Sequence, residues 1–106
     1  MGVMSVNQTD VAVATKIKTP KVPKYAVVMY NDDVTTFDFV IGVLMEIFDK
    51  DQPTAAALTD LIHHTGSAEV GRYSREVAEV KVEETVSKAR QNGYPLVCKV
   101  EDIGDD

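Results

Sequence analysis

Residues 25–48 read YAVVMYNDDVTTFDFVIGVLMEIF, and this stretch decides the fold because its periodicity changes in the middle. Residues 25–30 are aromatic, β-branched or otherwise apolar, which is typical of a strand, and the Asn-Asp-Asp turn that follows ends it. Within residues 39–48 the apolar side chains recur at the spacing of an amphipathic helix. Thr35, with Asp38 three residues later, is a variant of the capping box and predicts where this helix starts.

Downstream of this stretch, two more helices and two short strands are expected. Asp51 predicts the start of a second helix, and Gly66 suits its C-terminal cap. Leu58, Leu61 and Ile62 are expected to form the apolar stripe of that helix. The remaining predicted elements are a strand over 68–73, a third helix from its cap Ser74 to Gly93, and a strand over 96–100.

The element order, β-α-α-β-α-β, is typical of an α+β domain with its helices on one face of a small sheet. A length of 106 residues suffices for one such domain, and a second is not expected. We assign the domain to residues 24–102. It follows an aperiodic flexible extension over 1–23 and precedes a polar end over 103–106.

Composition disfavours several classes of protein. No stretch approaches the roughly 18 consecutive apolar residues of a membrane span, and the only cysteine, Cys98, cannot form an internal disulfide. We therefore expect a cytoplasmic protein without a membrane partner. Residues 1–24 hold four lysines and one aspartate, so the rest of the chain is more acidic than the overall net charge of −6. Such a body repels nucleic acid and suits a cationic ligand or a basic protein surface.

Asn31, Asp32 and Asp33 gather acceptor groups in the turn between the first strand and the first helix. Asx residues are common in turns because they bond to their own backbone, so the cluster has a purely structural interpretation. A functional interpretation requires a second group close to the turn. The predicted second helix supplies one in the form of a histidine.

His63 lies one turn after Thr59 on that helix. If this face packs beside the start of the first helix, the imidazole lies near the acidic turn, although a partly buried structural histidine is the alternative. His64 points about 100° away, so the two histidines cannot chelate one ion together. Asp32, Asp33 and His63 could still bind a divalent cation, which leaves a small metal protein or enzyme as another alternative.

Several short motifs, taken in order, resemble the ClpS family. They are Tyr30-Asn31-Asp32-Asp33-x-Thr35, Phe39-Val40-Ile41 with Val43-Leu44, His63 followed by Gly66, Glu76-Val77-Ala78-Glu79-x-Lys81-Val82, and Tyr94-Pro95-Leu96. The resemblance covers residues 25–101 and implies a three-stranded antiparallel sheet with three helices packed on it. It also implies a monomeric adaptor, without catalysis or cofactor, that binds N-degron proteins beginning with a bulky hydrophobic residue. Such an adaptor delivers these substrates to a ClpA-like or ClpC-like ATPase of a Clp protease.

The resemblance implies roles for individual residues. Those expected to bind the free α-amino group of the substrate, or to lie beside it, are Asn31, Asp32, Asp33, Thr35 and His63. Those expected to form an apolar pocket below it are Phe37, Thr59, Ile62 and Leu96. Those expected to contact the ATPase, although alone they look like solvated helix charges, are Glu76 and Lys81.

Phe37 and Thr59 depart from the family pattern, which usually has methionine at both positions. A phenyl ring is stiffer than methionine and is expected to admit flat aromatic side chains and exclude those branched at Cβ. Thr59 leaves volume at the wall and offers a hydroxyl to a phenol or an indole N–H. We therefore expect Phe, Tyr or Trp as first residue to bind better than Leu, with Ile and Val weakest. The altered pocket also permits an alternative, a regulator that occupies the ATPase without delivering substrates.

Overall fold

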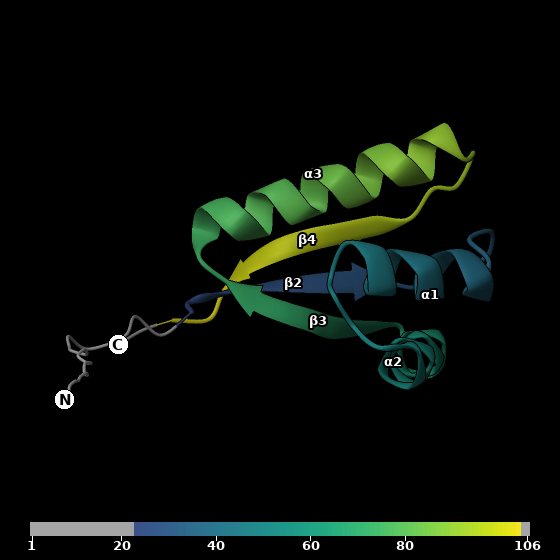
Figure 1. The fold of residues 1–106 in the computed structure, drawn as a ribbon, viewed down its shortest axis with the longest axis horizontal. Coiled ribbons are helices and arrows are strands. Elements are labelled where there is room, and N and C mark those ends of the chain that lie inside the picture. The colour runs from purple at the N-terminus through teal and green to yellow at the C-terminus, as the bar shows by residue number, and fades with distance from the viewer. Residues whose placement is uncertain (1–22, 105–106) are drawn as a thin grey trace, which may run out of the picture.

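The computed structural model describes residues 23–104 and confirms the predicted element order (Figure 1). The first strand leads through the acidic turn into two successive helices, and the third helix joins the remaining two strands. The elements are β2 (Tyr25–Tyr30), α1 (Phe37–Glu46), α2 (Gln52–Thr65), β3 (Ser67–Tyr73), α3 (Arg75–Gln91) and β4 (Val97–Asp102).

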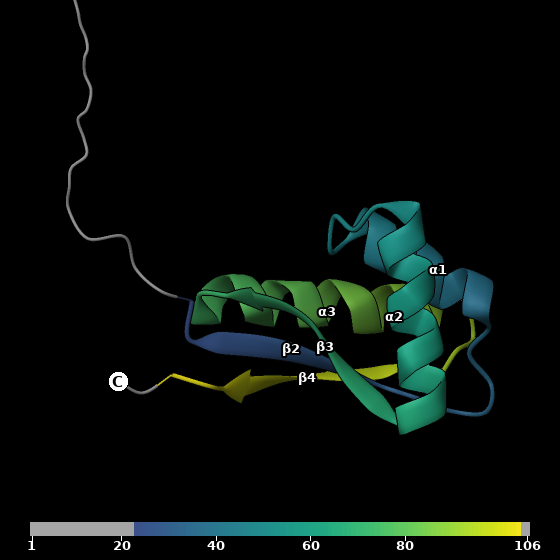
Figure 2. The ribbon, with the colours of Figure 1, turned by 90° about the horizontal axis from the view of Figure 1, so that it is seen from below.

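Strand β2 is the centre of a three-stranded antiparallel sheet with the order β3-β2-β4. Met29 of β2, for example, lies opposite Ala68 of β3 on one side and Cys98 of β4 on the other. Helix α3 runs along the sheet and packs against all three strands, while α2 packs against β3 and α1 (Figure 2). Because β2 is central, the acidic turn at its end emerges in the middle of the sheet, beside α1 and α2.

The core lies between the sheet and the helices. Val27 and Met29 contribute to it from β2 and Leu44 from α1, and all three are completely buried. Helix α3 contributes the small residues Ala78 and Ala89, whose size lets that helix lie close to the sheet. Burial of these apolar side chains is the main favourable contribution to the stability of such a domain.

Helix α1 begins one residue later than the sequence predicts. Its N-cap is Thr36, whose hydroxyl accepts a hydrogen bond from the Phe39 N–H at 3.2 Å. The prediction that Thr35 caps the helix is wrong, because the N–H and the hydroxyl of Thr35 both donate to Asp32. Asp38 lies in the first turn, where its negative charge is favourable beside the helix dipole.

The other two predicted helix starts and the end of α2 are confirmed, whereas α3 ends at Gln91 with Asn92 as its C-cap, just before the predicted Gly93. Asp51 caps α2 by accepting from the Thr54 N–H at 2.9 Å, Gly66 ends α2 in a left-handed conformation, and Ser74 caps α3. The predicted apolar stripe of α2 differs in part from the buried face of that helix. Leu61 is 47% exposed, and the fully buried positions of that helix are Ala55, Thr59 and Ile62.

Two predictions on domain limits lie outside the described residues, at least in part. Residues 1–22 and 105–106 are not described, so the flexible extension over 1–23 and the polar end over 103–106 remain predictions. Among residues 23–104, no helix has both the length and the apolar character that crossing a membrane requires.

Candidate functional site

A cavity of about 360 Å³ opens where the acidic turn, the first turn of α1 and one face of α2 meet. All the residues predicted for the ammonium site and for the apolar pocket line this one cavity. They are Asn31, Asp32, Asp33, Thr35, Phe37, Thr59, Ile62, His63 and Leu96. Sequence reasoning missed several further lining residues, which are Met29, Tyr30, Val34, Thr36 and Val40.

The cavity has a buried apolar end and a polar mouth. Met29 and Leu96 are almost completely buried, and so are Ile62 and Val40 beside them. Around the opening lie the exposed residues Asn31, Asp33, Phe37 and His63. This arrangement suits a ligand that combines a buried apolar body with a polar group at the surface.

The carboxylate of Asp32 is fixed in place by its own turn. Its Oδ1 accepts from the N–H groups of Val34 and Thr35 at 2.8 and 2.7 Å, and its Oδ2 accepts from the Thr35 hydroxyl at 2.7 Å. The structural interpretation of the acidic turn is therefore correct for Asp32. It does not exclude ligand binding, because each carboxylate oxygen has about two acceptor sites and Thr35 takes only one of those on Oδ2.

These hydrogen bonds also keep Asp32 ionised. Partial burial alone would raise the pKa of its carboxyl group. The bonds from the backbone and hydroxyl of Thr35 and from the Val34 N–H, with a smaller contribution from the charge of Arg90, outweigh that effect and hold the pKa below the usual 3.8. The mouth of the cavity therefore carries a negative charge at neutral pH.

A backbone hydrogen bond joins the acidic turn to the end of α2. The Asn31 N–H donates to the Gly66 carbonyl at 2.8 Å. Gly66 has φ of 98°, a conformation that glycine adopts without steric cost, and its own N–H donates to the Ile62 carbonyl. The C-terminal turn of α2, which carries His63, is thereby held beside Asn31 and Asp32.

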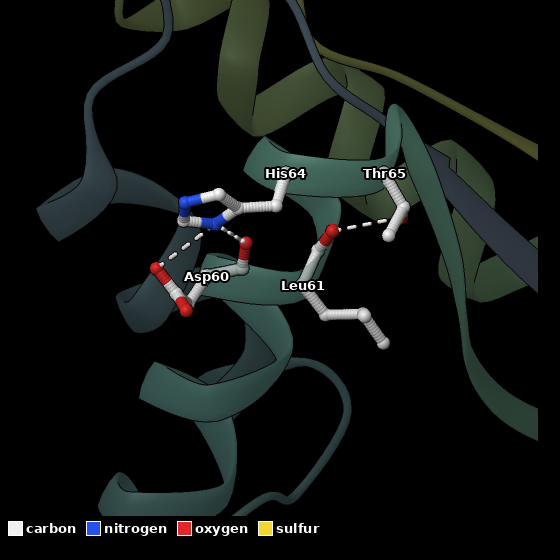
Figure 3. Close-up of polar contacts among 4 residues, drawn as sticks. All are labelled: Asp60, Leu61, His64 and Thr65. Atoms are coloured by element: carbon white, nitrogen blue, oxygen red, sulfur yellow. Dashed lines mark hydrogen bonds and ion pairs between the residues drawn. The ribbon is translucent and has the colours of Figure 1, made fainter.

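The two adjacent histidines face different surroundings. The His63 ring lies edge-on to the Phe37 ring, with centroids 5.1 Å apart, and lines the cavity. His64 turns back to its own helix, where Nδ1 lies 2.9 Å from the Asp60 carbonyl oxygen and 3.3 Å from its carboxylate (Figure 3). Because a carbonyl oxygen only accepts, Nδ1 is the donor in that bond. In the same view Thr65 donates to the Leu61 carbonyl at 2.8 Å.

The alternative of a metal site has no support in residues 23–104, because no three His, Cys, Asp or Glu side chains there are arranged to hold an ion. Cys98 lies buried in β4, as a small apolar residue would. Burial raises the pKa of its thiol to about 11, although a hydrogen bond with Thr85 acts in the opposite direction. The thiol is therefore protonated at neutral pH.

Helix α3 carries a separate surface depression that includes both residues predicted to contact the ATPase. Its lining residues are Glu76, Val77, Val80, Lys81 and Glu84, of which the two valines are exposed. The interpretation of Lys81 as a solvated charge is wrong. Its ammonium group is partly buried and donates to the Ile47 carbonyl at 2.6 Å, and it lies 5.3 Å from the centroid of the Tyr73 ring.

Comparisons with known proteins agree on one family. The family model described as ATP-dependent Clp protease adaptor protein ClpS matches residues 20–99. The ATP-dependent Clp protease adapter protein ClpS of Nitratidesulfovibrio vulgaris is 38% identical over 95 residues, which are 90% of this chain and 89% of that protein. The corresponding protein of Nautilia profundicola is 47% identical over 79 residues, 74% of this chain and 81% of that one.

A solved structure gives the same result. The structure of Agrobacterium tumefaciens ClpS2 bound to L-phenylalaninamide matches with a TM-score of 0.73 and 34% sequence identity. The match covers 76% of this chain and 99% of that chain.

Proposed function

The chain belongs to the ClpS family of adaptor proteins for the ATP-dependent Clp protease, and from that premise we propose that its cavity binds the first residue of substrate proteins. As a member of this family it is an adaptor and not an enzyme. The observation that carries the proposal is that one cavity joins a negatively charged polar mouth to a buried apolar end. L-phenylalaninamide, the ligand of the Agrobacterium relative, has the matching shape of a free α-amino group beside an aromatic side chain.

The mouth of the cavity suits the α-ammonium group of an N-terminal residue. An ammonium group is a cation with three N–H donors, so its complement is a fixed set of acceptors. Asp32 offers the remaining acceptor site on Oδ2, and the amide oxygen of Asn31 and a ring nitrogen of His63 supply the others. Charge-assisted hydrogen bonds of this kind contribute roughly 1.5 to 3 kcal/mol each. An acetylated or internal residue lacks these donors and would leave the acceptors unmatched.

The buried end of the cavity suits one bulky side chain. Leu96, Ile62, Met29 and Val40 form apolar walls, and Phe37 lies at the opening. Burying a Leu or Phe side chain there contributes ~1.5 to 3 kcal/mol. Together with the ammonium contacts, and less the entropy lost on association, this predicts binding in roughly the micromolar range. Weak binding suits an adaptor that has to release its substrate.

Delivery requires a second surface, and we assign it to the depression on α3. Glu76 is exposed there beside the apolar side chains of Val77 and Val80, which is the composition of a docking site for a protein partner. The partner is a ClpA-like or ClpC-like ATPase. Because Lys81 also holds α3 against the end of α1, charge reversal at Glu76 tests docking more cleanly than a change at Lys81.

A fluorescence anisotropy titration tests the proposed function directly. A labelled peptide that begins with Phe should bind with roughly micromolar affinity, and the same peptide with an acetylated N-terminus should not bind at comparable concentration. Equal binding of the two peptides would overturn the proposal. The alternative of a regulator that does not deliver predicts the same peptide binding, but no degradation of a Phe-initiated reporter by the reconstituted protease.

A further inference from the structure

Thr59 places a polar atom in an apolar part of the cavity wall. Its side chain is 3% exposed and lines the cavity together with Leu96 and Ile62. A threonine hydroxyl has one hydrogen to donate and two acceptor lone pairs. The hydrogen is committed, because Oγ1 donates to the Ala55 carbonyl at 2.8 Å within the same helix. Towards a ligand, Thr59 can therefore act only as an acceptor.

The acceptor side of this hydroxyl has no partner among residues 23–104. No N–H or O–H group in that part of the chain donates to Thr59 Oγ1, whereas the Ala55 carbonyl is the partner of its hydrogen. The buried side chains that line the cavity with Thr59 are Met29, Val40, Ile62 and Leu96, and none of these has an N–H or O–H group to donate. An unmatched acceptor in a buried position gains more from a ligand donor than an exposed one would.

We propose that Thr59 makes the cavity select first residues whose aromatic ring carries an N–H or O–H donor, namely Trp and Tyr, over rings of equal size without one. The inference rests on the proposed function and adds to it a chemical criterion for the side chain. Small hydroxyl residues would leave most of the cavity empty. Lys and Arg would have to bury a charge without a counter-charge, which is strongly unfavourable. Phe and Leu are apolar throughout and offer no donor.

Pairs of isosteric peptides test the inference on the unmodified protein. One pair begins with Trp or with 3-benzothienylalanine, in which sulfur replaces the indole N–H. The other begins with Tyr or with 4-methylphenylalanine, in which a methyl group replaces the hydroxyl. All four peptides share the same sequence from the second residue onward. In at least one pair, the donor peptide should bind about fivefold more tightly than its isostere, the scale of one net hydrogen bond. Equal affinities in both pairs would overturn the inference.

Two variants connect the effect to Thr59 itself. Thr59→Val keeps the shape and removes the hydroxyl, so the donor peptide should lose its advantage while its isostere binds within about twofold of its original affinity. Thr85→Val is the matched control, because the Thr85 hydroxyl makes the same bond to the carbonyl four residues earlier, that of Lys81, but Thr85 does not line the cavity. That variant should keep the full donor advantage. A donor advantage that survives in Thr59→Val would assign the selection to another group and overturn the inference.

The acetylated forms of the same peptides separate this inference from the proposed function. If free-amino peptides bind and acetylated ones do not, but donor and isostere are equal, the selection by Thr59 fails and the proposed function stands. If acetylated and free peptides bind alike, or none binds, the proposed function fails and the inference fails with it.

Discussion

The ring of Phe37 lies edge-on against the imidazole of His63, with centroids 5.1 Å apart and an angle of 71° between the planes. The first residue of α1 and the last turn of α2 thus meet over the mouth of the cavity. One of these residues limits access to the apolar end, and the other is a candidate acceptor for the ammonium group. The residue that limits access to the apolar end and the candidate ammonium acceptor are therefore neighbours. Because they are different residues, separate substitutions can test the two roles.

Replacing Asp32 by Ala should weaken binding of a Phe-initiated peptide by at least about tenfold, or ~1.4 kcal/mol, because the charged acceptor is lost. Fluorescence anisotropy measures the change. Asp60→Ala is the control, since it also removes an aspartate side chain, but one that lies on α2, faces His64 and does not line the cavity. Affinity that is unchanged in Asp32→Ala would remove Asp32 from the site.

Stability should depend on the ionisation of Asp32 in acid. The folded-state pKa of this carboxyl lies below its unfolded value of about 3.8, so its contribution is fully present above that pH. The contribution is lost as the pH falls through the lower, folded pKa. The difference in unfolding free energy between the original protein and Asp32→Asn, measured by urea denaturation, should therefore shrink below pH ~3.8. A difference that stays constant from pH 7 to pH 3 contradicts this assignment.

Lys81 should matter for stability as well as for docking. Lys81→Met leaves the Ile47 carbonyl without its side-chain donor and should lower the free energy of unfolding by about 1 to 3 kcal/mol. Lys81→Arg retains N–H donors and should lose less. Charge reversal at the exposed Glu76 should change stability by less than about 0.5 kcal/mol and yet abolish co-elution with the ATPase. Co-elution that survives this reversal would remove Glu76 from the docking surface.

The buried thiol of Cys98 should react slowly in the native protein. Burial raises its pKa from 9.0 to about 11, so its thiolate fraction near neutral pH is about a hundredfold below that of an ordinary thiol. Alkylation by iodoacetamide should be correspondingly slow until guanidinium unfolds the chain. Above pH 9 the unfolded thiol ionises before the folded one, so this group makes stability fall as the pH rises towards 11. Rapid alkylation without unfolding would show that β4 opens locally.

Thr59→Met should improve binding of Leu-initiated peptides by about 1 kcal/mol, the value of one or two buried methylenes, because methionine fills volume that threonine leaves. In the unmodified protein, Leu should bind more weakly than Phe, and the Cβ-branched residues Ile and Val more weakly still. Phe37→Met replaces the ring at the opening by a flexible chain. It should therefore reduce the difference in affinity between Leu-initiated peptides and those that begin with Ile or Val. Leu and Phe peptides of equal affinity would show that these two positions do not set selectivity.

The order of elements was predictable because local patterns report it directly. The alternation between strand and helix around the acidic turn, and the caps at Asp51, Gly66 and Ser74, depend on residues close together in the chain. The choice between two adjacent threonines as the cap of α1 did not follow from such a pattern. It depends on Asp32 binding the N–H and hydroxyl of Thr35, which leaves Thr36 to cap the helix.

The features that were missed depend on tertiary packing. Periodicity locates an apolar stripe only approximately, and in α2 it is centred on Ala55, Thr59 and Ile62, so Leu61 is left exposed. The bond from Lys81 to the Ile47 carbonyl joins residues 34 apart in the sequence, and no local pattern indicates it. The gathering of the candidate site residues around one cavity was expected from the family resemblance. Spacing alone placed Thr59 and His63 on one face of α2, and put His63 near the acidic turn only if that face packs beside the start of α1.

The hydrogen bond from the Asn31 N–H to the Gly66 carbonyl also controls how fast the Asn31 amide exchanges its hydrogen with solvent. It closes the seam between the acidic turn and the end of α2, so the Asn31 amide can exchange its hydrogen with solvent only when that seam opens. The exchange rate of this single amide therefore reports how readily the two halves of the cavity separate. A ligand whose ammonium group contacts both the acidic turn and the end of α2 would hold them together, so its binding should slow hydrogen exchange at the Asn31 amide.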